Sequence, residues 1–219
     1  MPQAPPKQPA AATENVVVNR ALKPYGTSIF SEMTVLAEEF DAVNLSQGFP
    51  DVDGPEHIRR LAADAIMRGP NQYIPSIGLP ALRRAVAAKA KRFYDIDVDA
   101  DLEVTATAGA TEGLSATLLG LLEPGDEVIL LEPAYDSYAP LAALAGARIR
   151  HVCLAPPDFA LPRDELAAAF SDQTKAIVIN NPQNPCGKVF TRAELEFVGE
   201  LCCRHDACAI ADEVYEHLV

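Results

Sequence analysis

This sequence has no apolar run close to the roughly 20 residues that a membrane-spanning helix needs, and positive charge is scarce. Its 18 lysines and arginines are outnumbered by 31 aspartates and glutamates, which gives a formal net charge of −13. Because nucleic acids and anionic membranes require a basic surface, we expect neither as a partner. The first 14 residues, MPQAPPKQPAAATE, lack the apolar core of a secretory signal and the arginines of a transit peptide. We expect them to be disordered.

Metal-binding and nucleotide-binding motifs are also missing. The cysteines form no CxxC pair and the four histidines are scattered, so no ligand set has workable spacing for a metal ion. The five cysteines are Cys153, Cys186, Cys202, Cys203 and Cys208. Their odd number is typical of free buried thiols in a reducing cytoplasm, where we place the protein. No G-x-G-x-x-G and no G-x-x-x-x-G-K-[ST] occurs, which argues against a dinucleotide site and a P-loop.

A regular alternation of apolar strands and helices is present from about residue 103. The predicted strands cover 103–109, 127–133, 147–154, 175–182 and 207–212, and the predicted helices cover 110–126, 134–146, 161–170 and 191–206. Such alternation indicates βαβ units and a parallel sheet of the α/β class. The strands lack polar alternation, as expected when helices cover both faces of the sheet. Thr191 and Glu194 form a capping-box pattern at the start of the last helix.

Before residue 100 the pattern changes to two long loops, each followed by a helix. These loop–helix segments span 44–69 and 71–97. Their loops carry Gly, Pro, Asn and Tyr and are longer than ordinary connections, which is typical of loops with a functional role.

In an open parallel sheet, ligands bind beyond the carboxyl ends of the strands, and four predicted strands end in residues suited to binding. The first ends at Gly109, where a tight turn would open a helix whose unpaired amides attract phosphate. Small-residue turns of this kind are common, so an ordinary turn is the alternative. The second strand ends in Glu132-Pro133-Ala134-Tyr135, which supplies an aromatic ring.

The other two strand ends carry an amide-rich turn and an acid. In NNPQNPCG (180–187) the prolines stiffen the turn and can hold the amide of Asn184 toward a ligand oxygen. An ordinary Asn-Pro turn is the alternative. Asp212 follows the strand ACAIA directly. It is either the N-cap of a following helix or a partly buried carboxylate paired with a cation such as a protonated pyridine nitrogen. In the second case, the hydroxyl of Tyr215 could lie on the same side.

Together the four strand ends offer a phosphate cradle, an aromatic ring, an amide donor and an acid–tyrosine pair, the set that pyridoxal phosphate (PLP) requires. Six motifs carry a family resemblance: NLSQGFPDVDGPE, NQYIPSIGLPALRRA, TAGATEG, PGDEVILLEPAYDSY, NNPQNPCGKVFTRAEL and ADEVYEHLV. In this order they resemble the front half of a class I/II aminotransferase of PLP fold type I. They are most similar to the branch of kynurenine/glutamine, methionine and succinyldiaminopimelate aminotransferases.

The resemblance implies a fold and a division of the chain. The fold would be a three-layer αβα domain of the α/β class with a mostly parallel sheet. A disordered tail would span 1–14, and an N-terminal arm with part of the small domain would span 15–45. The PLP-binding large domain would span 46–219 and be incomplete at its C-terminal side.

The resemblance also assigns cofactor contacts to residues of this chain. The backbone amides of Ala110-Thr111 would bind the phosphate of PLP, and Tyr135 would stack on its ring. Asn184 and Tyr215 would bind its phenolic oxygen. Asp212 would pair with the ring nitrogen and keep it protonated.

Two further roles concern the substrate and a second subunit. Gly48 and Asn184 would bind the substrate, an amino acid or a 2-oxo acid. Tyr73 would reach the phosphate held by the partner subunit, because the sites of the family lie at a homodimer interface.

The Schiff-base lysine and the substrate-binding arginine of the family follow the stretch where this chain stops, so we expect the catalytic lysine beyond Val219. The lysines present are Lys7, Lys23, Lys89, Lys91, Lys175 and Lys188. None is a credible substitute, and Lys188 belongs to the ordinary surface pattern of the family. We therefore expect this chain alone to lack efficient transaminase activity, because the base that moves the substrate's α-proton is missing.

Three functions remain open at this point. The first is ping-pong transfer of an amino group from an amino acid to a 2-oxo acid through pyridoxamine phosphate. The second is a PLP-dependent β-lyase that acts on cysteine conjugates and releases pyruvate and ammonia. The third is a non-catalytic remnant or binding module that binds no PLP.

Overall fold

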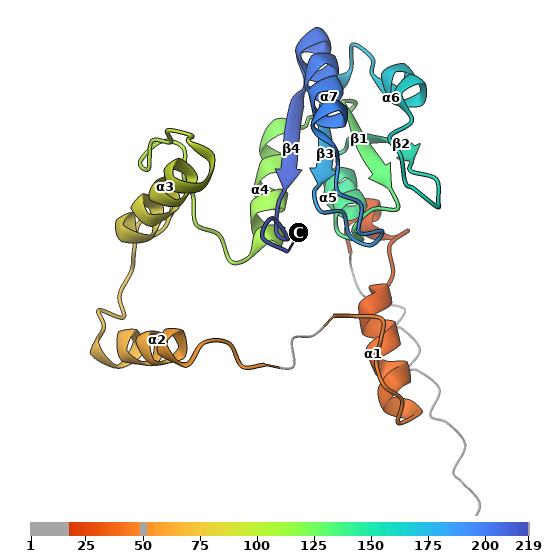
Figure 1. Cartoon of the computed structure of the whole chain (residues 1–219). Coiled ribbons are helices and arrows are strands. Elements are labelled where there is room, and N and C mark those ends of the chain that lie inside the picture. Colours follow the sequence, from red (N-terminus) through yellow and green to blue (C-terminus); the bar gives the residue numbers. More distant parts are fainter. Residues whose placement is uncertain (1–17, 49–51, 219) are drawn as a thin grey trace, which may run out of the picture.

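A four-stranded parallel sheet forms the centre of the protein in a computed structural model that describes residues 18–48 and 52–218. The strands are β1 (Glu127–Glu132), β2 (Arg148–Cys153), β3 (Thr174–Asn180) and β4 (Cys208–Asp212), in the order β2-β1-β3-β4. All three neighbouring pairs are parallel, so the strands end at the same edge of the sheet (Figure 1). These four strands match four of the five predicted ones.

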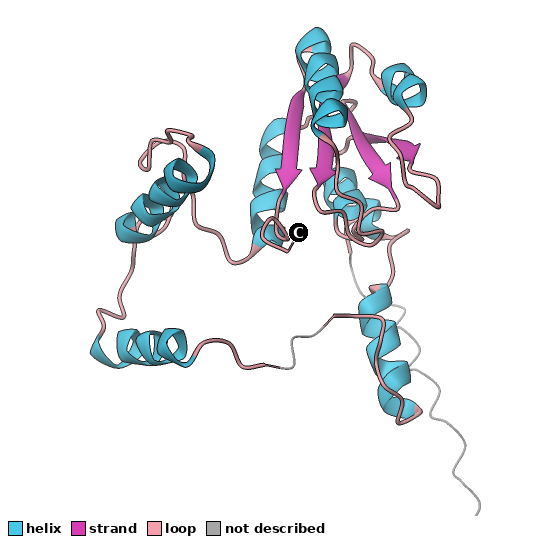
Figure 2. Cartoon of the chain, in the orientation of Figure 1, coloured by secondary structure: helices cyan, strands magenta, loops and turns pink. Residues whose placement is uncertain are grey.

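Helices cover both faces of this sheet (Figure 2). Helices α4 (Ala110–Leu121) and α5 (Tyr138–Leu144) pack on one face, and α6 (Arg163–Ala169) and α7 (Arg192–His205) pack on the other. Alternate residues of β1 point to the two cores, with Val128 and Leu130 toward α4 and α5 and Ile129 and Leu131 toward α6 and α7. Full burial of such a side chain stabilises the fold by about 1.5–3 kcal/mol. The α/β class and the three-layer αβα arrangement are confirmed.

Burial differs between the central and the outer strands. β1 and β3 are almost wholly buried, as the missing polar alternation predicted, whereas β2 and β4 expose most of their residues. The cysteines follow the same division. All five are free, but only Cys202 is buried, and Cys153, Cys203 and Cys208 are exposed. The expectation of buried thiols is therefore wrong for these three.

The strand predicted over 103–109 is wrong. Residues 104–107 have no regular secondary structure and join no ladder among the described residues. The backbone N–H of Ala106 instead donates to the carbonyl of Ile77, at 3.0 Å. A strand exists only where a second strand supplies hydrogen-bond partners, and the local preference of Val and Thr for extended backbone does not provide them.

The capping box predicted at residue 191 is confirmed at the start of α7. The hydroxyl of Thr191 accepts from the backbone N–H of Glu194, at 3.3 Å. The carboxylate of Glu194 accepts in return from the backbone N–H of Thr191, at 2.8 Å. The helix ends at His205, and its C-cap, Asp206, adopts the left-handed conformation.

The described part before residue 100 consists of helices joined by loops. It contains the short 3₁₀ helix η1 (Arg20–Leu22), α1 (Ile29–Glu39), α2 (Glu56–Arg68) and α3 (Pro80–Tyr94). Helices α2 and α3 match the two predicted after long loops, whereas α1 was not predicted. Figure 1 shows α1 and α2 projecting away from the sheet, and neither has a buried residue.

The proposed division of the chain stays a prediction, and the tail over 1–14 lies outside the described residues. Among the helices the structure describes, none has the length and apolar character needed to cross a membrane. The described residues also contain no cluster of His, Cys, Asp and Glu suited to a metal ion.

Candidate functional site

A pocket of about 140 Å³ lies at the carboxyl ends of the strands. Its walls come from the start of α4, the segment after β1, the turn after β3 and the segment after β4. The lining residues are Ala110, Thr111, Leu114, Tyr135, Tyr138, Asn180, Asn184, Asp212, Val214 and Tyr215. All six residues expected to contact the cofactor within the subunit therefore line one pocket, and the parallel topology brings them together.

The start of α4 forms one wall. Gly109 adopts a φ of +84°, which favours glycine because a side chain there is strained. The helix begins at Ala110, and among the described residues no side chain caps it. The amides of Ala110 and Thr111 therefore begin a helix end that carries partial positive charge and attracts anions.

Asp212 lines the pocket from the end of β4. Its backbone carbonyl accepts from the side-chain amide of Asn180 and from the backbone N–H of Asn181, both at 3.0 Å. Its carboxylate accepts from the hydroxyl of Tyr138, at 2.7 Å, and from the backbone N–H of Val214, at 3.3 Å. Residues 214–217 form turns rather than a helix, so the alternative of Asp212 as a helix N-cap is wrong.

Tyr138 is a site residue that sequence reasoning missed. Burial, together with the hydrogen bond to Asp212, raises the pKa of Tyr138 far above its ordinary value. The hydroxyl therefore keeps its proton and donates to the carboxylate. Its ring also meets the ring of Tyr135 edge to face, with centroids 5.6 Å apart. The spacing of only three residues between the two tyrosines was the available signal.

Replacing Tyr138 by phenylalanine should lower the free energy of unfolding by about 1–2 kcal/mol, because Asp212 loses a donor while the ring still fills its space. Urea denaturation at neutral pH measures the change. Tyr25→Phe is a suitable control, since it removes a hydroxyl from a partly exposed ring. Equal stability of Tyr138→Phe and the unmodified chain would show that this hydrogen bond contributes nothing.

Asn184 and Tyr215 meet across the pocket. The side-chain amide of Asn184 donates to the hydroxyl of Tyr215, at 3.4 Å. The next residue, Glu216, accepts from the ammonium of Lys89 and the hydroxyl of Tyr94 on α3, which fixes the turn that carries Tyr215. The two groups expected at one ligand oxygen are therefore neighbours, and among the described residues that line the pocket none is a lysine.

Tyr73 and Gly48 are not part of this pocket. Tyr73 is fully exposed in the loop before α3, and Gly48 is exposed beside residues 49–51, which are not described. The neighbouring Gln47 lines a larger hollow of about 960 Å³ between residues 24–38 and the starts of α4 and α5. This hollow shares Thr111 and Tyr135 with the pocket. The roles of Tyr73 and Gly48 stay predictions.

Comparisons with known proteins identify the family to which the chain belongs. The model of the family "Aminotransferase class I and II" matches residues 41–219. The probable N-succinyldiaminopimelate aminotransferase DapC of Mycobacterium tuberculosis is 49% identical over 200 residues, which are 90% of this chain and 50% of that protein. The methionine aminotransferase of Escherichia coli is 42% identical over 207 residues, which are 94% of this chain and 54% of that protein.

Solved structures give the same result. The structure of N-succinyldiaminopimelate aminotransferase from Mycobacterium tuberculosis superimposes with a TM-score of 0.88 at 47% identity, covering 92% of this chain and 53% of that one. The chain thus spans about half the length of the curated relatives it matches. On the match of the family model and these identities, the chain belongs to the class I and II aminotransferases.

Proposed function

We propose that this chain forms the cofactor-binding half of a PLP-dependent aminotransferase, which moves an amino group from an amino acid to a 2-oxo acid. The observation that carries the proposal is the placement of Asp212. Its carboxylate lies in the same pocket as the start of α4 and the Asn184–Tyr215 pair, so one small molecule can meet an acid, an amide, a phenol and a helix N-terminus together.

The residues of the pocket fit PLP group by group. The uncapped start of α4 suits the dianionic phosphate. The Tyr135 ring suits a flat aromatic ring, and the Asn184–Tyr215 pair supplies two possible donors for a phenolic oxygen. The Asp212 carboxylate suits a protonated pyridine nitrogen, a charge-assisted contact.

PLP, when bound, supplies the electron-withdrawing ring that makes the α-proton of an amino acid acidic. The residues of this chain hold and orient that ring. Asp212, oriented by Tyr138, favours the proton on the ring nitrogen, which strengthens electron withdrawal. Asn184 and Tyr215 stabilise negative charge on the phenolic oxygen by hydrogen bonds.

Activity and assembly are further parts of the proposal. Tyr73, whose ring is fully exposed, would reach the phosphate site of a partner subunit in a homodimer, and Gly48 would offer its backbone to the substrate. We expect this chain alone to show no efficient turnover. Transamination and β-lyase assays on the purified chain, compared with a full-length relative, test that expectation.

Titration with PLP tests the proposal directly. We expect saturable binding that changes the visible absorption of PLP and stabilises the folded chain, by about 2.7 kcal/mol at a free concentration 100 times the dissociation constant. Pyridoxal, which lacks the phosphate, is the matched control ligand and should bind more weakly. A soluble, folded chain that shows neither binding nor stabilisation would contradict the proposal and favour a non-catalytic module.

A further inference from the structure

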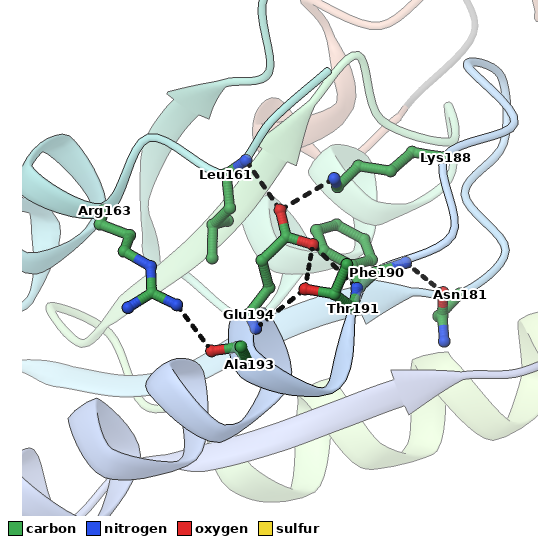
Figure 3. Close-up of polar contacts among 8 residues, drawn as sticks. All are labelled: Leu161, Arg163, Asn181, Lys188, Phe190, Thr191, Ala193 and Glu194. Atoms are coloured by element: carbon green, nitrogen blue, oxygen red, sulfur yellow. Dashed lines mark hydrogen bonds and ion pairs between the residues drawn. The ribbon is translucent and has the colours of Figure 1, made fainter. Parts of the chain in front are cut away.

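A partly buried ion pair joins Lys188, which follows the turn that carries Asn184, to Glu194 on α7 (Figure 3). The ammonium of Lys188 and the carboxylate of Glu194 are 2.9 Å apart, and their side chains are only 9% and 14% exposed. The assignment of Lys188 to a surface pattern is therefore wrong. Such a pair is costly to bury and often contributes little net stability, which raises the question of what it does.

Glu194 joins three segments of the chain. Its Oε1 accepts from Lys188 and from the backbone N–H of Leu161, at 3.1 Å, and its Oε2 accepts from the backbone and the hydroxyl of Thr191. Burial alone would raise the pKa of Glu194, but these hydrogen bonds outweigh it and lower the pKa to about 2. The carboxylate is therefore ionised at neutral pH and fixed by four donors, as Figure 3 shows.

The Lys188 backbone links this network to the turn after β3. Its carbonyl accepts from the backbone N–H of Gln183, at 2.8 Å, while the carbonyl of Gln183 accepts from the backbone N–H of Gly187, at 2.7 Å. The buried side chain of Gln183 donates to the carbonyls of Leu131, at 3.2 Å, and Pro133, at 2.7 Å. The turn is thus held at one end by β1 and at the other by α7.

Asn184 lies between Gln183, which is bonded to the end of β1, and Lys188, which is paired with α7. Its backbone N–H donates to the side-chain oxygen of Asn180, at 2.5 Å, and its own amide reaches Tyr215. A side chain keeps its direction when the turn that carries it is fixed at both ends. If one end of the turn is released, the side chain can point in several directions.

We propose that Lys188 and Glu194 are positioning residues for Asn184, and that the ion pair aims its amide at the phenolic oxygen of the bound cofactor. This inference rests on the proposed PLP site. The pair acts through the backbone of residues 183–188 and does not line the pocket.

The test removes both charges of the pair, so that neither is left without its partner. In the double variant Lys188→Met/Glu194→Gln, methionine keeps the length of the lysine stem and glutamine keeps the capping box. We expect PLP to bind about three- to ten-fold more weakly, the effect of one lost hydrogen bond. The matched control is Glu196→Gln on the same helix, whose pair with Arg192 is exposed, and it should leave PLP affinity unchanged.

The Asn184→Ala background separates positioning from a general structural effect. If the pair acts through Asn184, the double variant should cause no further loss of affinity in this background. An equal loss in both backgrounds, or unchanged affinity of the double variant, would overturn the inference while the PLP site itself stands.

Hydrogen exchange tests the inference without the cofactor. In the ligand-free chain, the backbone amides of Gln183 and Asn184 should exchange faster in the double variant than in the unmodified chain or in Glu196→Gln. Unchanged exchange would overturn the inference. The double variant could show faster exchange while the unmodified chain binds no PLP. That result would support the role of the ion pair in fixing the turn and would contradict the proposed function.

Discussion

Replacing Asp212 by alanine should weaken PLP binding about 10- to 100-fold, the cost of losing a charge-assisted hydrogen bond to the ring nitrogen. The carboxylate lies in the pocket with its orientation set by Tyr138 and Val214. Equilibrium titration of the purified chain with PLP, followed by visible absorption, measures the change.

Asp212→Asn separates charge from shape in the same experiment. Asparagine can still accept from Tyr138 but carries no charge, so its affinity for PLP should fall nearly as far as that of Asp212→Ala. Asp172→Ala removes an exposed carboxylate before β3 and serves as the control. If Asp212→Asn binds PLP as tightly as the unmodified chain, the proposed pairing with a protonated ring nitrogen is wrong.

Lys188→Met alone should lower the free energy of unfolding by about 1–3 kcal/mol at pH 7, because the partly buried carboxylate of Glu194 loses its charged donor and keeps only those of Leu161 and Thr191. The double variant with Glu194→Gln should recover most of this loss. Urea denaturation of both variants measures the difference, and equal stability of Lys188→Met and the unmodified chain would mean that the ion pair contributes no net stability.

The same pair predicts a pH dependence. Since the pKa of Glu194 is lowered to about 2 from an ordinary 4.5, its stabilising contribution is complete above pH 4.5 and is lost as the pH falls toward 2. Glu194→Gln should remove this part of the acid sensitivity. Its stability relative to the unmodified chain should therefore rise as the pH is lowered from 5 to 3.

The sequence predicted the central sheet because its signals there are local. The apolar runs of β1 and β3 are buried on both faces, and the capping box at Thr191 depends on residues three positions apart. The position of the pocket was predictable from one rule of topology. Because the strands are parallel, Asp212 and Asn184, which come at or just after strand ends, lie at the same edge of the sheet.

The missed features depend on partners far away in the chain. Residues 104–107 have the composition of a strand, yet pairing is decided by what lies beside them. The place of the Lys188 ammonium depends on the Glu194 carboxylate, which also accepts from the backbone of Leu161, 33 residues earlier, and the role of Tyr138 depends on Asp212, which is 74 residues away. Non-local contacts of this kind leave no periodic signal in a single sequence.

The pocket draws its walls from segments that begin at Ala110 and end at Tyr215, so no short piece of the chain can form it alone. Only a molecule in which β1, β3, β4 and α4 are assembled presents the full set of contacts. A ligand that needs all of these contacts binds only native molecules. The amount of ligand bound at saturation therefore equals the amount of folded protein in the sample. The stoichiometry of PLP binding would then report the yield of correct folding in any preparation of this chain.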